Sequence, residues 1–166
     1  MYSEPRLGTT FRIYVPAVNQ EMRADKQVSA PQELLQGTET LLLVEDGAPL
    51  RTLYHRILED RGYTVLEAGD SQRAIQIAEQ YAGNIALLLT DVSLPKLNGT
   101  VLAKILLQQR PTMKVLFMSG HSDDVISGPD HLLHVGTNFI QKPFAAEELF
   151  RRLREILDPQ KPEMAA

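Results

Sequence analysis

The sequence predicts an α/β domain built on a doubly wound, five-stranded parallel sheet with helices on both faces. Short apolar runs without in-and-out alternation recur from residue 40 onward, as expected of strands that are covered on both sides. Segments with helical spacing of apolar residues lie between these runs, and right-handed crossovers place such helices on both faces of a sheet. The second run alternates apolar and polar residues, which suits a strand at the edge of the sheet. This predicts the strand order 2-1-3-4-5.

The five strands are predicted from their apolar content and length. The three continuously apolar runs are assigned to the middle of the sheet, and the alternating run and the shortest run to its edges. In chain order, the strands are expected at 40–44 (TLLLV), 63–68 (YTVLEA), 85–89 (IALLL), 114–118 (KVLFM) and 138–141 (NFIQ).

Helices are predicted where apolar residues recur three and four positions apart. The first is expected at 49–60, with Pro49 in its first turn. Its apolar stripe consists of Leu50, Leu53, Tyr54, Ile57 and Leu58. Further helices are expected at 71–82, 100–109 and 145–157. A helix within 126–136 is expected to be short or broken, because Gly128 and Pro129 interrupt it.

Composition narrows the classes of function. The 166 residues are 43% hydrophobic and 23% charged, the balance of a globular protein with one domain and an additional segment. A net charge of -4 argues against a general binder of nucleic acid or of anionic membranes. The absence of cysteine excludes disulfides and thiolate chemistry. Without a signal-peptide pattern or a membrane-length apolar run, we expect a cytoplasmic chain that contacts neither nucleic acid nor membrane.

The chain divides into four regions. Residues 17–38 are mostly polar without sustained apolar periodicity, and we interpret them as a linker. Residues 39–158 form the predicted domain, and residues 159–166 a flexible tail. Residues 1–16 precede the linker.

Polar side chains stand at the predicted carboxyl ends of the strands, where ligands bind in sheets of this kind. Glu45 and Asp46 follow the first strand, Asp91 the third, Ser119 the fourth and Lys142 the fifth. The first and third strands are predicted neighbours, so three carboxylates should converge. Such a cluster is costly unless a cation neutralises it, and carboxylate oxygens are the ligands that Mg²⁺ prefers.

The two remaining groups indicate an anionic ligand. Lys142 supplies a positive charge and Ser119 a hydroxyl donor, both facing the acidic cluster. A metal-binding acid cluster opposite two anion-directed donors is typical of a site for phosphoryl transfer. Asp91, on the central strand between the two sets of groups, is the candidate nucleophile.

In order and spacing, these motifs resemble the receiver domain of two-component response regulators. The resemblance covers about Thr40 to Leu157 and rests on LLLVED, LLLTDVSLPKLNG, FMSG and FIQKPF. It implies that Asp91 accepts a phosphoryl group from a phosphohistidine of a histidine-kinase domain or of a histidine phosphotransfer protein. It also implies Mg²⁺ held by Asp46, Asp91 and the Ser93 carbonyl, with Glu45 acting through water.

The same resemblance implies roles for the surrounding residues. Ser119 would bind a phosphoryl oxygen, and Lys142 would pair with the phosphate. Ser119 and Phe139 would form the switch that reports phosphorylation. Three residues would shape the adjoining loops: Pro95, Gly99 and Pro143. Pro143 belongs to a lysine–proline peptide, which is commonly cis in this family. A signalling module is expected rather than an enzyme.

The N-terminal segment carries a second resemblance. GTTFRIYVP, at residues 8–16, is similar to the closing strand of a histidine-kinase ATP-binding domain. Residues 1–16 are therefore interpreted as a remnant of such a domain, and the chain as the C-terminal piece of a hybrid sensor kinase. Residues 9–15 are expected to be an orphaned strand, either disordered or paired with an edge of the sheet.

Three rival functions share part of this pattern. An aspartyl-phosphate hydrolase of the haloacid-dehalogenase type has a second aspartate two residues after its nucleophile, where this sequence has Ser93. A flavodoxin-like nucleotide binder needs a phosphate-cradling loop after its first strand, where this chain has the carboxylates of VEDGAP. A pseudo-receiver that acts only through protein contacts remains an alternative.

Overall fold

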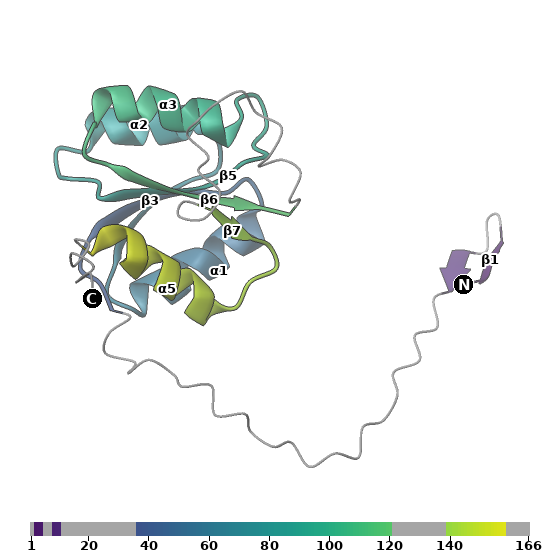
Figure 1. Cartoon of the computed structure of the whole chain (residues 1–166). Helices are drawn as coiled ribbons and strands as arrows, with labels where there is room; N and C mark the ends of the chain where they lie inside the picture. The colour runs from purple at the N-terminus through teal and green to yellow at the C-terminus, as the bar shows by residue number, and fades with distance from the viewer. Residues whose placement is uncertain (1, 5–7, 11–35, 121–138, 159–166) are drawn as a thin grey trace, which may run out of the picture.

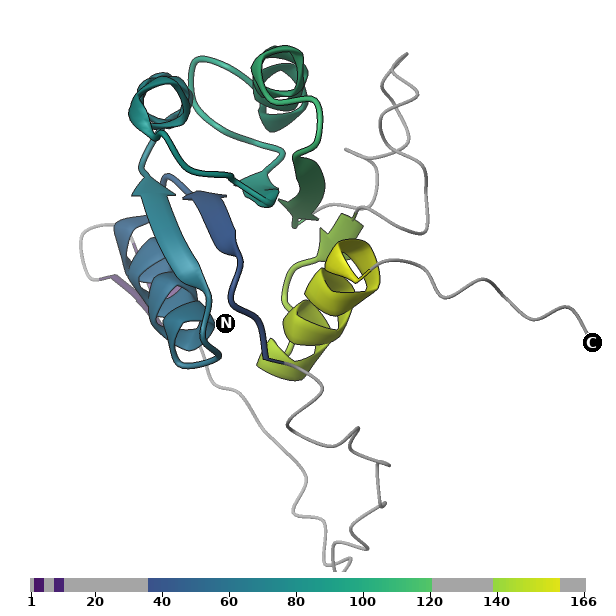
Figure 2. The ribbon, with the colours of Figure 1, turned by 90° about the vertical axis from the view of Figure 1, so that its left-hand side faces the viewer.

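The computed structural model describes residues 2–4, 8–10, 36–120 and 139–158. From residue 36 onward, the described residues form three layers, with a parallel sheet between two pairs of helices (Figure 1). Helices α2 and α3 cover one face of the sheet, and α1 and α5 cover the other, as a second view at right angles also shows (Figure 2).

The sheet has the predicted order. Its strands run in parallel in the order β4-β3-β5-β6-β7, which in chain order is 2-1-3-4-5. The doubly wound fold is therefore confirmed, although individual strand ends differ from the predicted ones by one or two residues. The bounds are β3 (Thr40–Val44), β4 (Thr64–Ala68), β5 (Leu87–Asp91), β6 (Lys114–Ser119) and β7 (Phe139–Gln141).

Four helices lie in the described part of the chain, each close to its predicted range. Asp70 caps α2 by accepting a hydrogen bond from the Arg73 N–H at 2.8 Å, and Asn98 caps α3 through the Thr100 N–H at 2.8 Å. The helix predicted within 126–136 lies outside the described residues. The bounds are α1 (Ala48–Glu59), α2 (Ser71–Gln80), α3 (Gly99–Gln109) and α5 (Ala146–Leu157).

The core lies on both faces of the sheet, which explains the continuously apolar strands. Leu42 and Leu88 point toward α2 and α3, whereas Leu41, Leu43 and Leu89 point toward α1 and α5. All five are fully buried. Alternate residues of one strand therefore serve opposite cores, so no position of the central strands is left for a polar outward face.

The apolar stripe of α1 is only partly used for packing. Tyr54 and Leu58 are buried as expected, but Leu50 is 42% exposed and Leu53 is 51% exposed. The helix begins at the carboxyl edge of the sheet, where the strands end and give its first turns little cover. This part of the predicted stripe therefore forms an exposed apolar surface.

The N-terminal strand finds a local partner. Strand β1 (Tyr2–Glu4) pairs antiparallel with β2 (Gly8–Thr10) in a two-stranded sheet of their own. Residues 9 and 10, expected to belong to an orphaned strand that is disordered or paired with an edge, are instead paired with β1, because a partner a few residues away costs little loop-closure entropy. Residues 11–16 of the same motif lie outside the described residues.

The last residues of the predicted linker are bound to the domain. The Gly37 N–H donates to the Arg61 carbonyl at 3.1 Å, and the Glu39 carbonyl accepts from the Thr64 N–H at 3.0 Å. The Glu39 carboxylate forms two bonds with the Arg154 guanidinium of α5, at 2.9 and 2.7 Å. Gly37 and Glu39 are thus bonded to the domain, and α5 holds the residue that precedes its first strand.

The Glu39–Arg154 pair predicts a loss of stability in acid. The hydrogen bonds that Glu39 accepts from Arg154 hold the pKa of Glu39 below its ordinary value, although partial burial acts to raise that pKa. A depressed folded-state pKa stabilises the fold above the unfolded-state pKa, and this stabilisation is lost as the pH falls through the folded-state value. We expect Glu39→Gln to lower the free energy of unfolding by about 1 kcal/mol at neutral pH.

The measurement is denaturant unfolding of both proteins between neutral pH and about pH 3, below the ordinary glutamate range. The difference between wild type and Glu39→Gln should shrink as the pH falls. A difference that stays constant with pH would mean that the pair contributes no charge-dependent stability.

Candidate functional site

The predicted polar residues gather at the carboxyl edge of the sheet. Glu45 and Asp46 directly follow β3, and Asp91 is the last residue of β5, which pairs with β3. One ligand atom from each of these three carboxylates lies within 4.8 Å of the others. Parallel strands end at the same edge, so adjacency in the sheet is what brings the acidic groups together.

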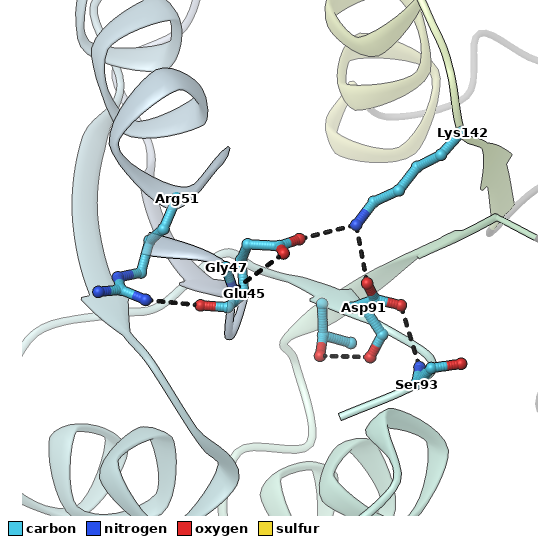
Figure 3. A network of polar contacts seen from close by, with 7 residues as sticks. Glu45, Gly47, Arg51, Asp91, Ser93 and Lys142 are labelled. Carbon is cyan, nitrogen blue, oxygen red and sulfur yellow. Dashed lines mark hydrogen bonds and ion pairs between the residues drawn. The ribbon is translucent and has the colours of Figure 1, made fainter. Parts of the chain in front are cut away.

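Lys142 bridges two of these carboxylates. Its ammonium donates to Glu45 Oε2 at 2.7 Å and to Asp91 Oδ2 at 2.7 Å (Figure 3). The side chains are 17% exposed for Lys142, 3% for Glu45 and 15% for Asp91. Burial lowers the pKa of Lys142, but the hydrogen bonds to Asp91 and Glu45 outweigh it and hold that pKa above its ordinary value.

The backbone around Glu45 is held from α1. The carboxylate of Glu45 also accepts the Gly47 N–H at 3.2 Å. The guanidinium of Arg51 donates to the Glu45 carbonyl at 2.8 Å (Figure 3). Glu45 is thus held at its nearly buried carboxylate by its own loop and at its backbone carbonyl by the first turns of α1.

Asp91 is oriented by the loop that follows it. Its Oδ1 accepts the Ser93 N–H at 3.0 Å, while Oδ2 faces Lys142. Its carbonyl accepts the hydroxyl of Thr90, a fully buried residue of β5, at 3.1 Å. Both oxygens of the carboxylate therefore have donors, and the carboxylate is held at the mouth of the sheet.

Gly99 lies against the backbone of Asp91. A Cβ at this position would stand 2.0 Å from the Asp91 carbonyl oxygen and 3.2 Å from the Thr90 hydroxyl oxygen. The Gly99 N–H donates to the Val92 carbonyl at 2.9 Å. The first residue of α3 can come this close to β5 only because it has no side chain.

The rest of this loop is exposed but anchored. Pro95 is exposed, and its carbonyl accepts the Leu97 N–H at 2.9 Å. Between them, Lys96 has a φ of 70°, a left-handed conformation that is uncommon for a residue with a side chain. The Leu97 carbonyl accepts the buried hydroxyl of Ser71 at 3.1 Å, which ties the loop to α2.

The remaining predicted residues lie on β6, β7 and the segment after β7. Ser119 is fully buried at the end of β6, and its carbonyl accepts the Lys142 N–H at 2.7 Å. Phe139 is half-buried and packs against the core under α2 and α3. The Lys142–Pro143 peptide bond is cis.

The charges at this edge suit a divalent cation. Glu45, Asp46 and Asp91 with Lys142 sum to a formal charge of 1 - 3 = -2, while Arg51 is turned toward a backbone carbonyl. Carboxylate oxygens at this separation are hard ligands that suit Mg²⁺. The predicted carbonyl ligand, Ser93, is exposed in the loop two residues after Asp91.

Comparison with known proteins gives the family. The model of the response regulator receiver domain matches residues 41–154. The chain belongs to this family. No helix in the described residues of this receiver domain is long and apolar enough to cross a bilayer.

Individual relatives agree with this assignment. The chain is 34% identical over 165 residues to "Sensor kinase CckA" of Brucella abortus (strain 2308), covering 95% of this chain and 17% of that protein. It is 36% identical over 123 residues to "Aerobic respiration control protein ArcA" of Escherichia coli (strain K12), covering 72% of this chain and 49% of that protein. The chain therefore spans about half or less of the curated relatives that it matches.

A solved structure of a receiver domain has a similar fold. The receiver domain from the hybrid histidine kinase CckA is 35% identical, with a TM-score of 0.58 over 70% of this chain and 96% of that chain. The likeness covers almost all of that domain, so the fold and the family agree in sequence and in structure.

Sequence reasoning overlooked three residues that build this receiver site. They are Arg51 and Thr90, which hold backbone carbonyls, and Tyr54, whose ring centroid lies 5.9 Å from the Lys142 ammonium. A signal existed for two of them. Thr90 is a polar residue inside an apolar strand, and Tyr54 brings a hydroxyl into an otherwise aliphatic helical stripe.

Proposed function

We propose that this receiver domain is a phosphoacceptor in a two-component phosphorelay, with Asp91 as the acceptor and Mg²⁺ as the cofactor. The observation that carries the proposal is the surroundings of Asp91. Its carboxylate lies 2.7 Å from the Lys142 ammonium and within 4.8 Å of ligand atoms from Glu45 and Asp46. One oxyanion thus faces both a fixed positive charge and a group of metal ligands.

The proposed reaction moves one phosphoryl group. An oxygen of Asp91 forms a bond to phosphorus while the nitrogen–phosphorus bond of a phosphohistidine breaks. The electron pair of that bond returns to the imidazole, which is protonated at its other nitrogen and leaves as neutral imidazole. Mg²⁺ held by Asp46, Asp91, the Ser93 carbonyl and, through water, Glu45 would offset the negative charge on the phosphoryl oxygens.

The residues around Asp91 would position the reacting groups and offset their negative charge. Lys142 binds the Asp91 carboxylate before transfer. After transfer its ammonium would stay close enough to pair with a phosphoryl oxygen. Ser119, at the end of the neighbouring strand, supplies the hydroxyl donor. We propose that movement of Ser119 and Phe139 reports the modification, and that Pro95, Gly99 and Pro143 keep the adjoining loops in shape.

We further propose that the chain is the C-terminal part of a hybrid sensor kinase. The match to the sensor kinase covers 95% of the chain, so it extends into the residues before 39, whereas the match to the shorter regulator covers 72% of the chain. This supports a kinase remnant at residues 1–16 and a linker at 17–38. Because phosphohistidine donors are formed from ATP, the proposal also places the domain in the cytoplasm.

The donor would be a histidine-kinase domain or a histidine phosphotransfer protein. The exposed Leu50 and Leu53, in the first half of α1, offer it an apolar contact. The role is that of a signalling domain rather than an enzyme. Nothing in the proposed reaction requires contact with nucleic acid or membrane.

Intact mass after incubation with acetyl phosphate tests the proposal. Wild type should gain the mass of one phosphoryl group only when Mg²⁺ is present. Asp91→Asn should gain none, because an amide is a poor nucleophile and loses the charge that pairs with Lys142. The matched control is Asp60→Asn, at the exposed aspartate that directly follows α1, and it should be modified like wild type.

Two other outcomes would count against the proposal. A protein that binds Mg²⁺ but gains no phosphoryl group would be a pseudo-receiver that acts through contacts. An adduct that persists in Asp91→Asn would place the acceptor elsewhere.

A further inference from the structure

The ring of Tyr54 contacts the segment that carries Lys142 at two points. The Lys142 ammonium lies 5.9 Å from the ring centroid. The same ring stacks on Phe144, with centroids 5.6 Å apart and planes inclined by 19°. Tyr54 is only 7% exposed, so its ring is a fixed surface between α1 and the segment that follows β7.

The phenol of Tyr54 lies in the electrostatic field of the site. Burial raises the pKa of Tyr54, the positive charge of Lys142 opposes this, and the charges of Glu45 and Asp91 add to it. All three charged groups are therefore close enough to act on the phenol. The ring therefore lies near the same ammonium that donates hydrogen bonds to the two carboxylates.

Lys142 needs a third contact if a divalent cation binds. Its two hydrogen bonds end on Glu45 and Asp91, which are also candidate metal ligands. A divalent cation would compete for these carboxylates and would repel the ammonium at short range. An aromatic face attracts an ammonium without offering a ligand to Mg²⁺, so a bound cation would leave this contact between described residues in place.

We infer that Tyr54 is a positioning residue that acts through Lys142. Its aromatic face keeps the ammonium beside Asp91 when a divalent cation occupies the carboxylates. The effect on phosphoryl acceptance rests on the proposed function, whereas the contact between ring and ammonium does not.

A double-mutant cycle on the rate of phosphorylation by acetyl phosphate in Mg²⁺ tests this inference. The four proteins are wild type, Tyr54→Leu, Lys142→Met and the double variant. Tyr54→Leu should slow the reaction about three- to tenfold when Lys142 is present, and by less than about twofold in the Lys142→Met background. Tyr54→Phe keeps the aromatic face and should retain most of the rate.

Tyr63 provides a matched control. It is 3% exposed, and the guanidinium carbon of Arg154 lies 5.9 Å from its ring centroid, near the amino end of the sheet. Tyr63→Leu should lower the melting temperature at least as much as Tyr54→Leu. It should nevertheless slow phosphorylation equally with and without Lys142, because its effect is on the fold alone.

The outcomes separate the inference from the proposed function. If Tyr54→Leu slows the reaction equally in both backgrounds, Tyr54 is only a core residue and the inference is wrong. If wild type is never phosphorylated, the proposed function fails, and the contact is judged by nuclear Overhauser effects between the Tyr54 ring and the Lys142 ε-methylene. Their persistence in Mg²⁺ supports the inference, and their loss overturns it.

Discussion

Replacing Lys142 by methionine is expected to destabilise the metal-free protein and to make it more dependent on Mg²⁺. The substitution removes the ammonium 2.7 Å from both Glu45 and Asp91 and leaves the Glu45 side chain, which is only 3% exposed, without its counter-charge. Breaking such a pair on one side costs more than the pair contributes, because the other charge stays buried. We expect the free energy of unfolding to fall by about 2 kcal/mol, since Lys142 itself is partly exposed.

Magnesium should reverse much of this loss. Without Lys142 the formal charge of the site changes from -2 to -3, so a divalent cation should bind more tightly and stabilise the variant more than wild type. Phosphorylation by acetyl phosphate should nevertheless slow by about a hundredfold or more, because the fixed charge that meets the phosphoryl oxygens is gone.

The experiment combines unfolding curves with and without Mg²⁺ and rates of adduct formation. Lys114→Met is the matched control, an exposed lysine at the start of β6, and it should change stability by less than about 0.5 kcal/mol. Equal stability of Lys142→Met and wild type in the absence of metal would show that the bridge to Glu45 does not form in solution.

Gly99→Ala is expected to have the second large effect. The added methyl group would stand 2.0 Å from the Asp91 carbonyl oxygen and 3.0 Å from its carbonyl carbon. Both are backbone atoms of a central strand, so either α3 or the end of β5 must move. We expect a loss of about 3 kcal/mol, the upper part of the usual range for overpacking, even though alanine favours a helix.

The displacement should also reach the site. Asp91 holds one metal-ligand atom and accepts hydrogen bonds from Lys142 and the Ser93 N–H, so a shift of its backbone should weaken Mg²⁺ binding. Thermal unfolding and Mg²⁺ titration by calorimetry measure the two effects. The control is Gly120→Ala, where a Cβ would meet no atom of the described residues within 4 Å and which should behave like wild type in both measurements. Normal Mg²⁺ affinity in Gly99→Ala would mean that α3 moves and leaves Asp91 in place.

The fold could be predicted because its signals are local and numerous. Continuous apolar runs identified the central strands, since β3, β5 and β6 have a core on each face. The strand order then followed from the one run with visible alternation. Convergence of Glu45, Asp46 and Asp91 needed only that β3 and β5 be neighbours, which the structure shows.

Other features depended on contacts between residues distant in the sequence. Nothing in the apolar stripe of α1 distinguishes the exposed Leu50 and Leu53 from the buried Tyr54 and Leu58, because the cover comes from other elements. The pair between Glu39, the first residue of the predicted domain, and Arg154 joins positions 115 residues apart. The pairing of residues 8–10 with residues 2–4 depended on which other strand is close enough in space to form hydrogen bonds.

The amino-acid sequence by itself determined the order of strands and helices and which acidic groups stand at strand ends. Only the tertiary structure decided that Lys142 bridges Glu45 and Asp91, and that the ring of Tyr54 lies beside it. The physical reason is the range of the forces involved. Apolar periodicity repeats within one element, whereas a hydrogen bond or a cation–aromatic contact depends on placing side chains from separate elements to within a fraction of an ångström.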